Sequence, residues 1–132
     1  LVNDEAQKKY TKLGEDVIKN NQYAVVTMAG GQGTRLGHKG PKGTFLIDVL
    51  PEPKYLFQIL AENLERANKK YGITLPWYIM TSTENNAETV KFFENKLTIR
   101  TQIASKIIYN SSFSEFVSFF KILLENFKVI LK

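Results

Sequence analysis

Residues 23–44 read YAVVTMAGGQGTRLGHKGPKGT, an apolar run followed by a glycine-rich loop. Tyr23–Met28 is short, apolar and rich in β-branched residues, which is typical of a buried strand. Six glycines follow between Gly30 and Gly43. Because a loop after a buried parallel strand lies at the carboxyl edge of the sheet, where α/β folds bind ligands, this stretch predicts both a fold class and a site.

The residues around this loop complete an α/β unit. Apolar spacing predicts helices over residues 3–20, 54–71 and 86–95, with Asn3 or Asp4 as the first cap and Gly72 as the end of the second helix. The alternation of strand, loop, helix, strand and helix predicts a parallel, doubly wound sheet.

Shorter patterns supply the other expected elements. Leu75–Thr81 reads as a second buried strand, and Thr44–Val49 reads as a short extended piece. The first helix is expected to bury one apolar stripe. Its members are Tyr10, Leu13, Val17 and Ile18.

The Gly-rich loop has the chemistry of a phosphate site. Successive backbone N–H groups form an anion-binding nest, and Arg35 and Lys42 add positive charge that suits a polyphosphate. The pattern is not the dinucleotide fingerprint, whose third glycine position holds Leu36, nor a P-loop, whose Gly-Lys order is reversed at Lys42-Gly43. The alternatives are a flexible surface loop and plain surface charges, which a position between two core strands disfavours.

Several neighbouring polar residues carry weaker signals. Lys39 reads as a solvated charge, and His38 reads as an exposed loop histidine with no assigned role. Thr81 and Ser82 fit two interpretations equally well, as pocket-lining residues or as caps of the following helix.

Composition excludes several classes of protein. The 132 residues contain no cysteine and one histidine, so disulfide frameworks and Cys- or His-rich metal sites are excluded. No apolar run approaches the length of a membrane span, and nothing resembles a secretory signal. We expect a cytoplasmic protein with no membrane partner.

The net charge of +5 does not point to nucleic acid. Residues 1–95 hold 12 Lys and Arg against 11 Asp and Glu, whereas residues 96–132 hold 6 against 2. The basicity therefore belongs to the tail and not to the loop, and no basic stripe with interleaved aromatics accompanies the site.

Two separated strings resemble a known family. Ala29–Gly37 (AGGQGTRLG) with Pro41-Lys42-Gly43 resembles the signature of the UDP-sugar pyrophosphorylases, the UTP:sugar-1-phosphate uridylyltransferases of eukaryotic type. Leu56–Ile59 and Pro76–Ser82 fall where the UDP-N-acetylglucosamine pyrophosphorylase branch has near-identical strings. The resemblance covers about residues 2–96, and it is specific because both motifs and the spacing between them agree.

The resemblance implies a Rossmann-like, glycosyltransferase-A-like α/β nucleotidyltransferase core. It implies transfer of uridylyl from UTP to a sugar 1-phosphate, with N-acetylglucosamine 1-phosphate and glucose 1-phosphate both open as acceptors, and it implies Mg²⁺ as cofactor. By position, Ala29, Gly30 and Gly31 would contact uracil and ribose. Gly33, Thr34 and Arg35 would cradle the triphosphate, and Lys42 would neutralise charge at the α-phosphate. The implied nucleotide-binding residues are Ala29, Gly30, Gly31, Gly33, Thr34, Arg35 and Lys42, of which Arg35 and Lys42 are the expected catalytic residues.

Other parts of the family's active site have no counterpart here. The resemblance implies a uracil-reading Gln at the end of an aromatic-rich strand, and Ile107–Asn110 stands near that place without one. The sugar-binding Gly-Asn segment, the Asp that helps to hold Mg²⁺ and a second Lys are missing, so no metal ligand is assigned. We expect that this chain alone does not catalyse the transfer.

The tail differs from the rest of the chain. Residues 96–132 contain no Gly, Pro or Asp, and Ser111–Lys132 has an amphipathic helical pattern. We therefore divide the chain into residues 1–95, the N-terminal part of a nucleotidyltransferase domain, and residues 96–132, a divergent Ile/Phe/Lys-rich tail. Two alternatives would explain the change. Either the tail is read in an altered frame, or the chain joins only part of a longer protein.

Two functions from other classes compete with the transferase. One is a non-catalytic nucleotide- or phosphate-binding module, and the other is a protein whose basic, Phe-rich tail docks on a partner or a membrane surface. Self-association is also expected if the sheet has open edges.

Overall fold

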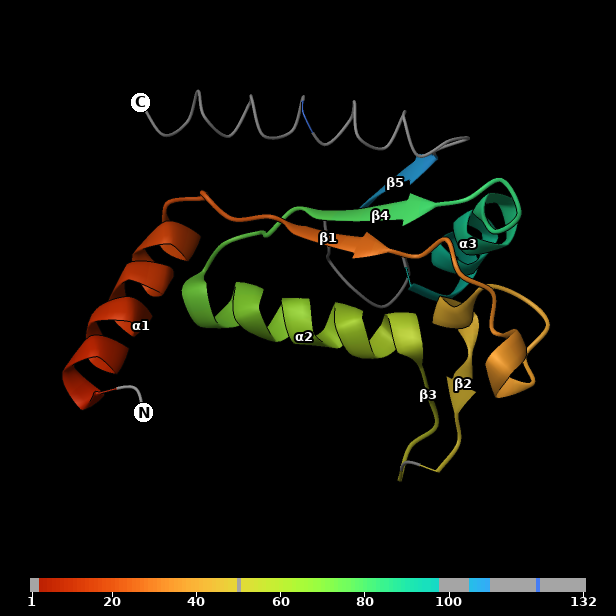
Figure 1. The fold of residues 1–132 in the computed structure, drawn as a ribbon, viewed down its shortest axis with the longest axis horizontal. Coiled ribbons are helices and arrows are strands. Elements are labelled where there is room, and N and C mark those ends of the chain that lie inside the picture. The colour runs from red at the N-terminus through yellow and green to blue at the C-terminus, as the bar shows by residue number, and fades with distance from the viewer. Residues whose placement is uncertain (1–2, 50, 98–104, 110–120, 122–132) are drawn as a thin grey trace.

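The structure is a computed structural model that describes residues 3–49, 51–97, 105–109 and 121. Figure 1 shows helices and strands arranged around one small parallel sheet. In chain order the labelled elements are α1 (Asp4–Lys19), β1 (Val25–Met28), β2 (Leu46–Ile47), β3 (Lys54–Tyr55), α2 (Leu56–Tyr71), β4 (Trp77–Thr81), α3 (Asn86–Phe92) and β5 (Ser105–Tyr109).

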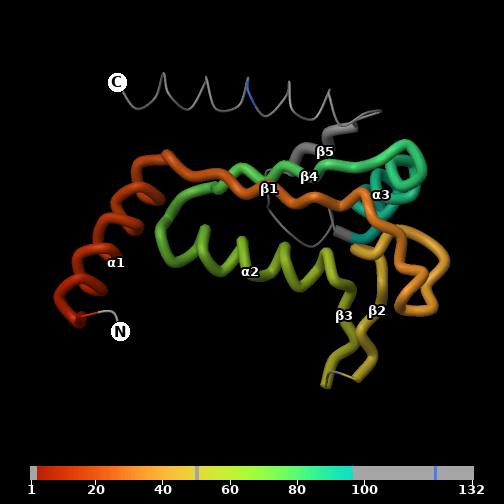
Figure 2. Tube along the Cα trace, viewed as in Figure 1, coloured from red at the N-terminus to blue at the C-terminus, as the bar shows by residue number. Residues whose placement is uncertain are grey.

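The main sheet has the parallel order β1-β4-β5. Val25 pairs with Trp77 and Trp77 with Ser105, so the three strands start level. Figures 1 and 2 show α2 running along one face of the sheet, with the Gly-rich loop and α3 beyond the ends of β1 and β4. The predicted Rossmann-like α/β arrangement is therefore confirmed, and it places the loop at the carboxyl edge of the sheet.

The core fills the space between α2 and the sheet. Trp77 and Ile79 of β4 are fully covered, and the ring of Trp77 is held in place by its Nε1–H, which donates to Thr27 Oγ1 at 2.9 Å. The face of β4 that carries Trp77, Ile79 and Thr81 is buried, and the opposite face, with Tyr78 and Met80, is half-buried. The buried apolar residues are Phe57, Ala61, Leu64, Leu75, Trp77, Ile79 and Phe93.

Two expectations about burial are wrong. β1 is not a buried strand: it is half-buried, and Met28 at its end is 70 % exposed. The cause is its position, because among the described strands β1 pairs only with β4 and so forms an edge. The apolar stripe of α1 is likewise only partly covered, since Tyr10 and Leu13 are exposed while Val17 and Ile18 are half-buried.

The bounds of the other elements follow the sequence with local differences. α1 begins as predicted, with Asn3 as its N-cap accepting from the Glu5 N–H. The extended piece expected at Thr44–Val49 is shorter, because residues 42–44 form a 3₁₀ turn and only β2 pairs with β3 in an antiparallel ribbon. The helix expected over residues 86–95 is α-helical as far as Phe92 and continues as one π-helical turn over Phe93–Leu97.

The sheet continues beyond residue 96. β5 lies within the segment that the sequence assigns to the tail, and it pairs in parallel with β4 along its whole length. Of the predicted helix over Ser111–Lys132, only Lys121 belongs to the described residues, and it is helical. The division of the chain at residue 95 stays a prediction. In the part of the chain that the structure describes, no helix is both long and apolar enough to cross a membrane.

An ion pair joins the β2–β3 ribbon to α2. Lys54 Nζ of β3 lies 2.7 Å from Glu62 Oε2, and Gln58 Nε2 donates to the other carboxylate oxygen at 2.8 Å. The hydrogen bond from Lys54 holds the pKa of Glu62 below its ordinary value of 4.5, against the opposing effect of burial. Glu62 is thus half-buried, and it ties the ribbon to the helix.

We predict a pH-dependent contribution of Glu62 to stability. Because the folded pKa of the carboxyl is lowered, its stabilisation is fully present above pH 4.5 and is lost as the pH falls through the folded pKa. Glu62→Gln should lower the free energy of unfolding at pH 7 by up to about 1 kcal/mol, since both side chains are about 30 % exposed. Urea unfolding should find a smaller difference at pH 3, with Glu65→Gln in the same helix as control. A difference that is equal at both pH values would contradict the prediction.

Candidate functional site

The Gly-rich loop folds back on itself as a small hairpin directly after β1. Gln32 and Pro41 form an isolated antiparallel bridge. On one side of this bridge the Gly33 N–H donates to the Gly40 carbonyl at 2.8 Å, and on the other the Lys42 N–H donates to the Gly31 carbonyl at 3.1 Å. The hairpin therefore places Lys42 beside Gly31, although the two are far apart in sequence.

The start of the loop is anchored by β4 and by the segment before α3. The Ala29 N–H donates to the Met80 carbonyl at 2.7 Å. Ser82 Oγ donates to the Gly30 carbonyl at 3.2 Å, and Asn85 Nδ2 makes a longer contact of 3.5 Å with the Ala29 carbonyl. The backbone that leaves β1 is thus fixed by three groups from a neighbouring strand and its following turn.

These contacts give the loop a polarity, because they occupy its carbonyl groups and leave several of its N–H groups unbonded. The carbonyls of Ala29, Gly30 and Gly31 each accept a hydrogen bond from the protein. Within the described residues, the N–H groups of Gly30, Gly31, Thr34 and Arg35 have no hydrogen-bond partner. A loop whose acceptors are occupied and whose donors are free favours an anion over a cation.

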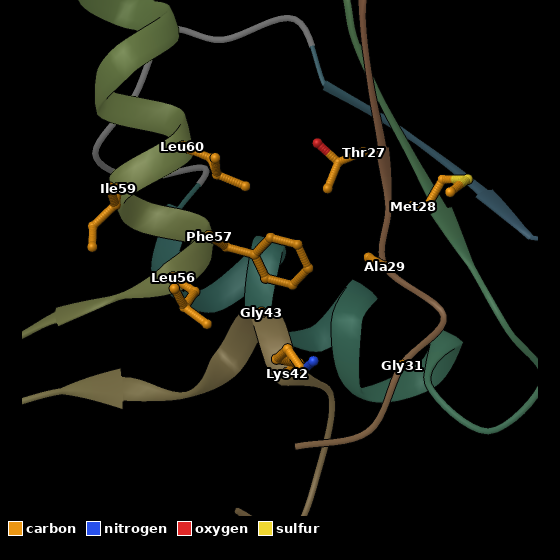
Figure 3. Close-up of a pocket in the computed structure, with 10 residues that line it drawn as sticks. All are labelled: Thr27, Met28, Ala29, Gly31, Lys42, Gly43, Leu56, Phe57, Ile59 and Leu60. Atoms are coloured by element: carbon orange, nitrogen blue, oxygen red, sulfur yellow. The ribbon is translucent and has the colours of Figure 1, made fainter. Parts of the chain in front are cut away.

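A cavity of about 280 Å³ lies between this loop, β1 and the first turns of α2. Figure 3 shows the Phe57 ring projecting from α2 toward β1, with Lys42 and Gly31 at one end of the space. The wall is largely apolar, and its polar side chains are those of Thr27 and Lys42. An apolar wall with a few polar groups is common in small-molecule sites. The lining residues are Thr27, Met28, Ala29, Gly31, Lys42, Gly43, Leu56, Phe57, Ile59 and Leu60.

Gly43 is required by the packing of the core against the loop. A Cβ on residue 43 would lie 2.1 Å from Cε2 of Phe57 and 2.2 Å from Cζ. Phe57 is 1 % exposed and packs against other aromatic rings, so it has little freedom to move away. The close approach of backbone to ring fixes the residue that follows Lys42.

The structure brings some of the predicted site residues together and separates others. Ala29, Gly31 and Lys42 line the cavity. Arg35 lies in an exposed 3₁₀ turn over Thr34–Leu36 and does not line it. Gly33 is buried, and its N–H already closes the hairpin, so its expected contact with phosphate rests on the resemblance alone.

Sequence reasoning missed or misjudged several residues of this site. Ser82 does not cap α3, whose N-cap is Asn85; its side chain holds the loop instead. Leu56 and Leu60, to which the sequence assigned no role in the site, both line the cavity, and Leu60 is 40 % exposed. Their position in the first turns of a helix that follows the loop was the available signal.

The described residues offer no metal centre. Among them, no three Asp, Glu or His side chains lie close enough together to hold an ion. The donor set that Mg²⁺ prefers, several oxygen ligands, is therefore not assembled by this part of the chain.

The Gly-rich loop and Lys42 thus lie at the carboxyl edge of a parallel α/β sheet, the place where such sheets bind ligands. The sequence model of the family described as UTP–glucose-1-phosphate uridylyltransferase matches residues 1–115 of this chain. The chain belongs to this family. The match runs beyond residue 96, so the extent expected from the sequence motifs was too short, in agreement with the place of β5 in the sheet.

Individual relatives are also similar to this chain. UDP-N-acetylglucosamine pyrophosphorylase of Saccharomyces cerevisiae is 45 % identical over 95 residues, covering 70 % of this chain and 20 % of the relative. UDP-N-acetylhexosamine pyrophosphorylase-like protein 1 of Homo sapiens is 34 % identical over 128 residues, covering 92 % and 25 %.

A solved structure agrees in fold. The uridine diphosphate N-acetylglucosamine pyrophosphorylase of Trypanosoma brucei, crystallised with an inhibitor, superimposes with a TM-score of 0.67 and 30 % identity over 85 % of this chain and 25 % of that chain. The chain thus spans about a fifth to a quarter of the length of these relatives.

The contact between Gly43 and Phe57 predicts that alanine lowers the stability of the fold at residue 43 but not at residue 31. Gly43→Ala should lower the free energy of unfolding by about 1–3 kcal/mol, because the buried ring must be displaced. Gly31→Ala is the matched control, since a Cβ there meets nothing within 4 Å. Denaturant unfolding of both variants measures the difference, and equal stability of the two would contradict the packing argument.

Proposed function

We propose that this chain provides the nucleotide-binding part of a UTP:sugar-1-phosphate uridylyltransferase. The reaction joins UTP and a sugar 1-phosphate to give a UDP-sugar and pyrophosphate. Family membership supports the reaction class. The relatives are named for N-acetylglucosamine and N-acetylhexosamine, which favours N-acetylglucosamine 1-phosphate over glucose 1-phosphate as the acceptor.

The observation that carries this proposal is the polarity of the Gly-rich loop. Its carbonyls are bonded to the protein while the N–H groups of Gly30, Gly31, Thr34 and Arg35 are available to a ligand. Lys42 adds a full positive charge at the point where the hairpin meets β1. Together they form a fixed set of donors for a triphosphate, and the apolar wall beside them suits a base or ribose.

In the proposed step a phosphate oxygen of the sugar 1-phosphate attacks the α-phosphorus of UTP. A new phosphorus–oxygen bond forms, and the bond from the α-phosphorus to the bridging oxygen of the β-phosphate breaks. Pyrophosphate leaves with the electron pair. The protein needs to supply mainly position and positive charge, and Lys42 and Arg35 are the residues to which we assign the charge.

We propose that Mg²⁺ and the complete reaction belong to the longer members of the family and not to this chain. Mg²⁺ is implied by the family resemblance, but the described residues do not fit it, and no step is assigned to it here. We propose that the 132-residue chain binds nucleotide without turnover. Formation of UDP-N-acetylglucosamine by the purified chain would overturn this statement.

A non-catalytic nucleotide- or phosphate-binding module is the second candidate function. The features that favour it are the same free amides and Lys42, because they explain binding without any further group. Binding of UTP with an affinity no greater than that of inorganic triphosphate would favour a phosphate module, because the base would then contribute nothing.

Two further proposals concern self-association and location in the cell. Self-association is favoured by β1, whose outer edge is unpaired among the described strands. A cytoplasmic location is proposed from the cysteine-free sequence. Concentration-dependent light scattering tests the first.

Lys42 gives the sharpest test of nucleotide binding. Lys42→Ala should weaken UTP binding about 10- to 100-fold, because a hydrogen bond to a charged group contributes about 1.5–3 kcal/mol. Lys39→Ala is the matched control, since this lysine lies in the same hairpin, is exposed and does not line the cavity.

Isothermal titration with UTP at fixed ionic strength measures both variants. Equal weakening by Lys39→Ala and Lys42→Ala would mean that net charge and not a defined site attracts the nucleotide. Absence of saturable binding by the unaltered chain would remove the proposed function.

A further inference from the structure

His38 lies at the centre of the hairpin and not on its outside. The residue is half-buried, and its backbone N–H donates to the Gly33 carbonyl at 3.1 Å. Its ring Nε2 lies 2.8 Å from Thr44 Oγ1, and the ring packs edge-to-face against Phe45 with centroids 5.9 Å apart. The expectation of an exposed histidine with no assigned role is therefore wrong as to its exposure.

The imidazole fills the space between the two arms of the hairpin. A Cβ on Gly33 would lie 2.8 Å from His38 Cβ and 2.9 Å from Cδ2. On the opposite arm, a Cβ on Gly40 would lie 3.3 Å from His38 Nε2 and 2.8 Å from Glu88 Oε2 of α3. The two glycines thus make room for the ring, and the ring keeps the arms at a fixed separation.

A short hydrogen-bond relay connects the ring to the backbone of the site. Thr44 Oγ1 donates to the Pro41 carbonyl at 2.8 Å. A hydroxyl has one proton, so Oγ1 must accept from His38, and Nε2 carries a hydrogen. The Pro41 carbonyl belongs to the peptide group whose N–H is that of Lys42, and that N–H donates to Gly31. The relay therefore ends on the peptide group that sets the position of Lys42.

We propose that His38 is a positioning residue of the nucleotide site, which holds Lys42 beside Gly31 before any nucleotide is bound. The inference rests on the proposed function for its consequence in binding, but its structural part concerns the nucleotide-free chain. The imidazole acts as a filler and hydrogen-bond donor and exchanges no proton with the substrate.

The physical benefit is preorganisation. The bridge of the hairpin has two backbone hydrogen bonds, at Gly33 and Lys42, and the loop between them is exposed over Thr34–Gly37. A loop that is disordered before binding must lose conformational freedom when the ligand arrives, and this loss lowers the affinity. A side chain that orders the loop in advance removes that cost.

Two pairs of variants separate the donor from the bulk of the side chain. His38→Ala removes the ring, whereas His38→Gln keeps an N–H donor near the place of Nε2. Thr44→Val removes the hydroxyl at nearly constant shape, whereas Thr44→Ser keeps it. None of the four changes the charge of Arg35 or Lys42.

The first measurement is amide hydrogen exchange at Gly33 and Lys42 in the nucleotide-free 132-residue chain. His38→Ala and Thr44→Val should each speed exchange at both amides by roughly tenfold, the equivalent of about one net hydrogen bond. His38→Gln and Thr44→Ser should stay close to the unaltered chain. The second measurement is UTP titration, in which the first two variants should bind roughly tenfold more weakly.

Each of the other outcomes tests the proposed role of His38. Unchanged exchange in Thr44→Val overturns the relay, and unchanged exchange in His38→Ala overturns the positioning role. If His38→Ala fails to fold, the threonine pair still decides. If the unaltered chain binds no UTP, the proposed function fails, while the exchange rates continue to test the role of His38 in the loop. If exchange responds but UTP affinity does not, the inference fails although the function stands.

Discussion

Phe57 packs against Trp77, Phe92 and Phe93, with ring centroids 5.0–6.5 Å apart, and the same ring leaves no room for a side chain on residue 43. One buried aromatic therefore belongs both to the core and to the wall of the cavity. Because close-packed interiors transmit small displacements, the position of the backbone after Lys42 depends on the packing of α2 against β4. The site is fixed by the core and not by its own loop alone.

The second constraint is the direction of the peptide groups after β1. Three consecutive carbonyls are bonded to Ser82, Asn85 and the Lys42 N–H, so their negative ends are turned into the protein. Hydrogen bonding at a carbonyl also polarises the peptide group and strengthens its own N–H as a donor. Glycine-rich composition makes such a backbone feasible, but the polarity comes from the partners that β4 and the turn before α3 provide.

The sequence predicted the elements that follow from local patterns. The helices, the buried strand β4 and the nearness of the loop to the sheet edge depend on apolar spacing and on glycine, which are visible in one chain. It did not predict the half-buried state of β1, because an edge position depends on which strands are neighbours. Nor could it predict the place of His38, since the contact with Thr44 depends on the fold of the hairpin. The separation of Arg35 from the cavity could not be predicted for the same reason, since it also depends on the conformation of the loop.

The described supports of the Gly-rich loop come from separate parts of the chain. Its contacts come from α2, from the end of β4 and from residues 82–85, and the relay through His38 lies within the loop itself. In the described structure these contacts shape the loop, whereas catalysis of transfer requires a second substrate and charge stabilisation from several directions. A chain that spans about a fifth of the length of the Saccharomyces cerevisiae relative thus contains the contacts that shape its Gly-rich loop.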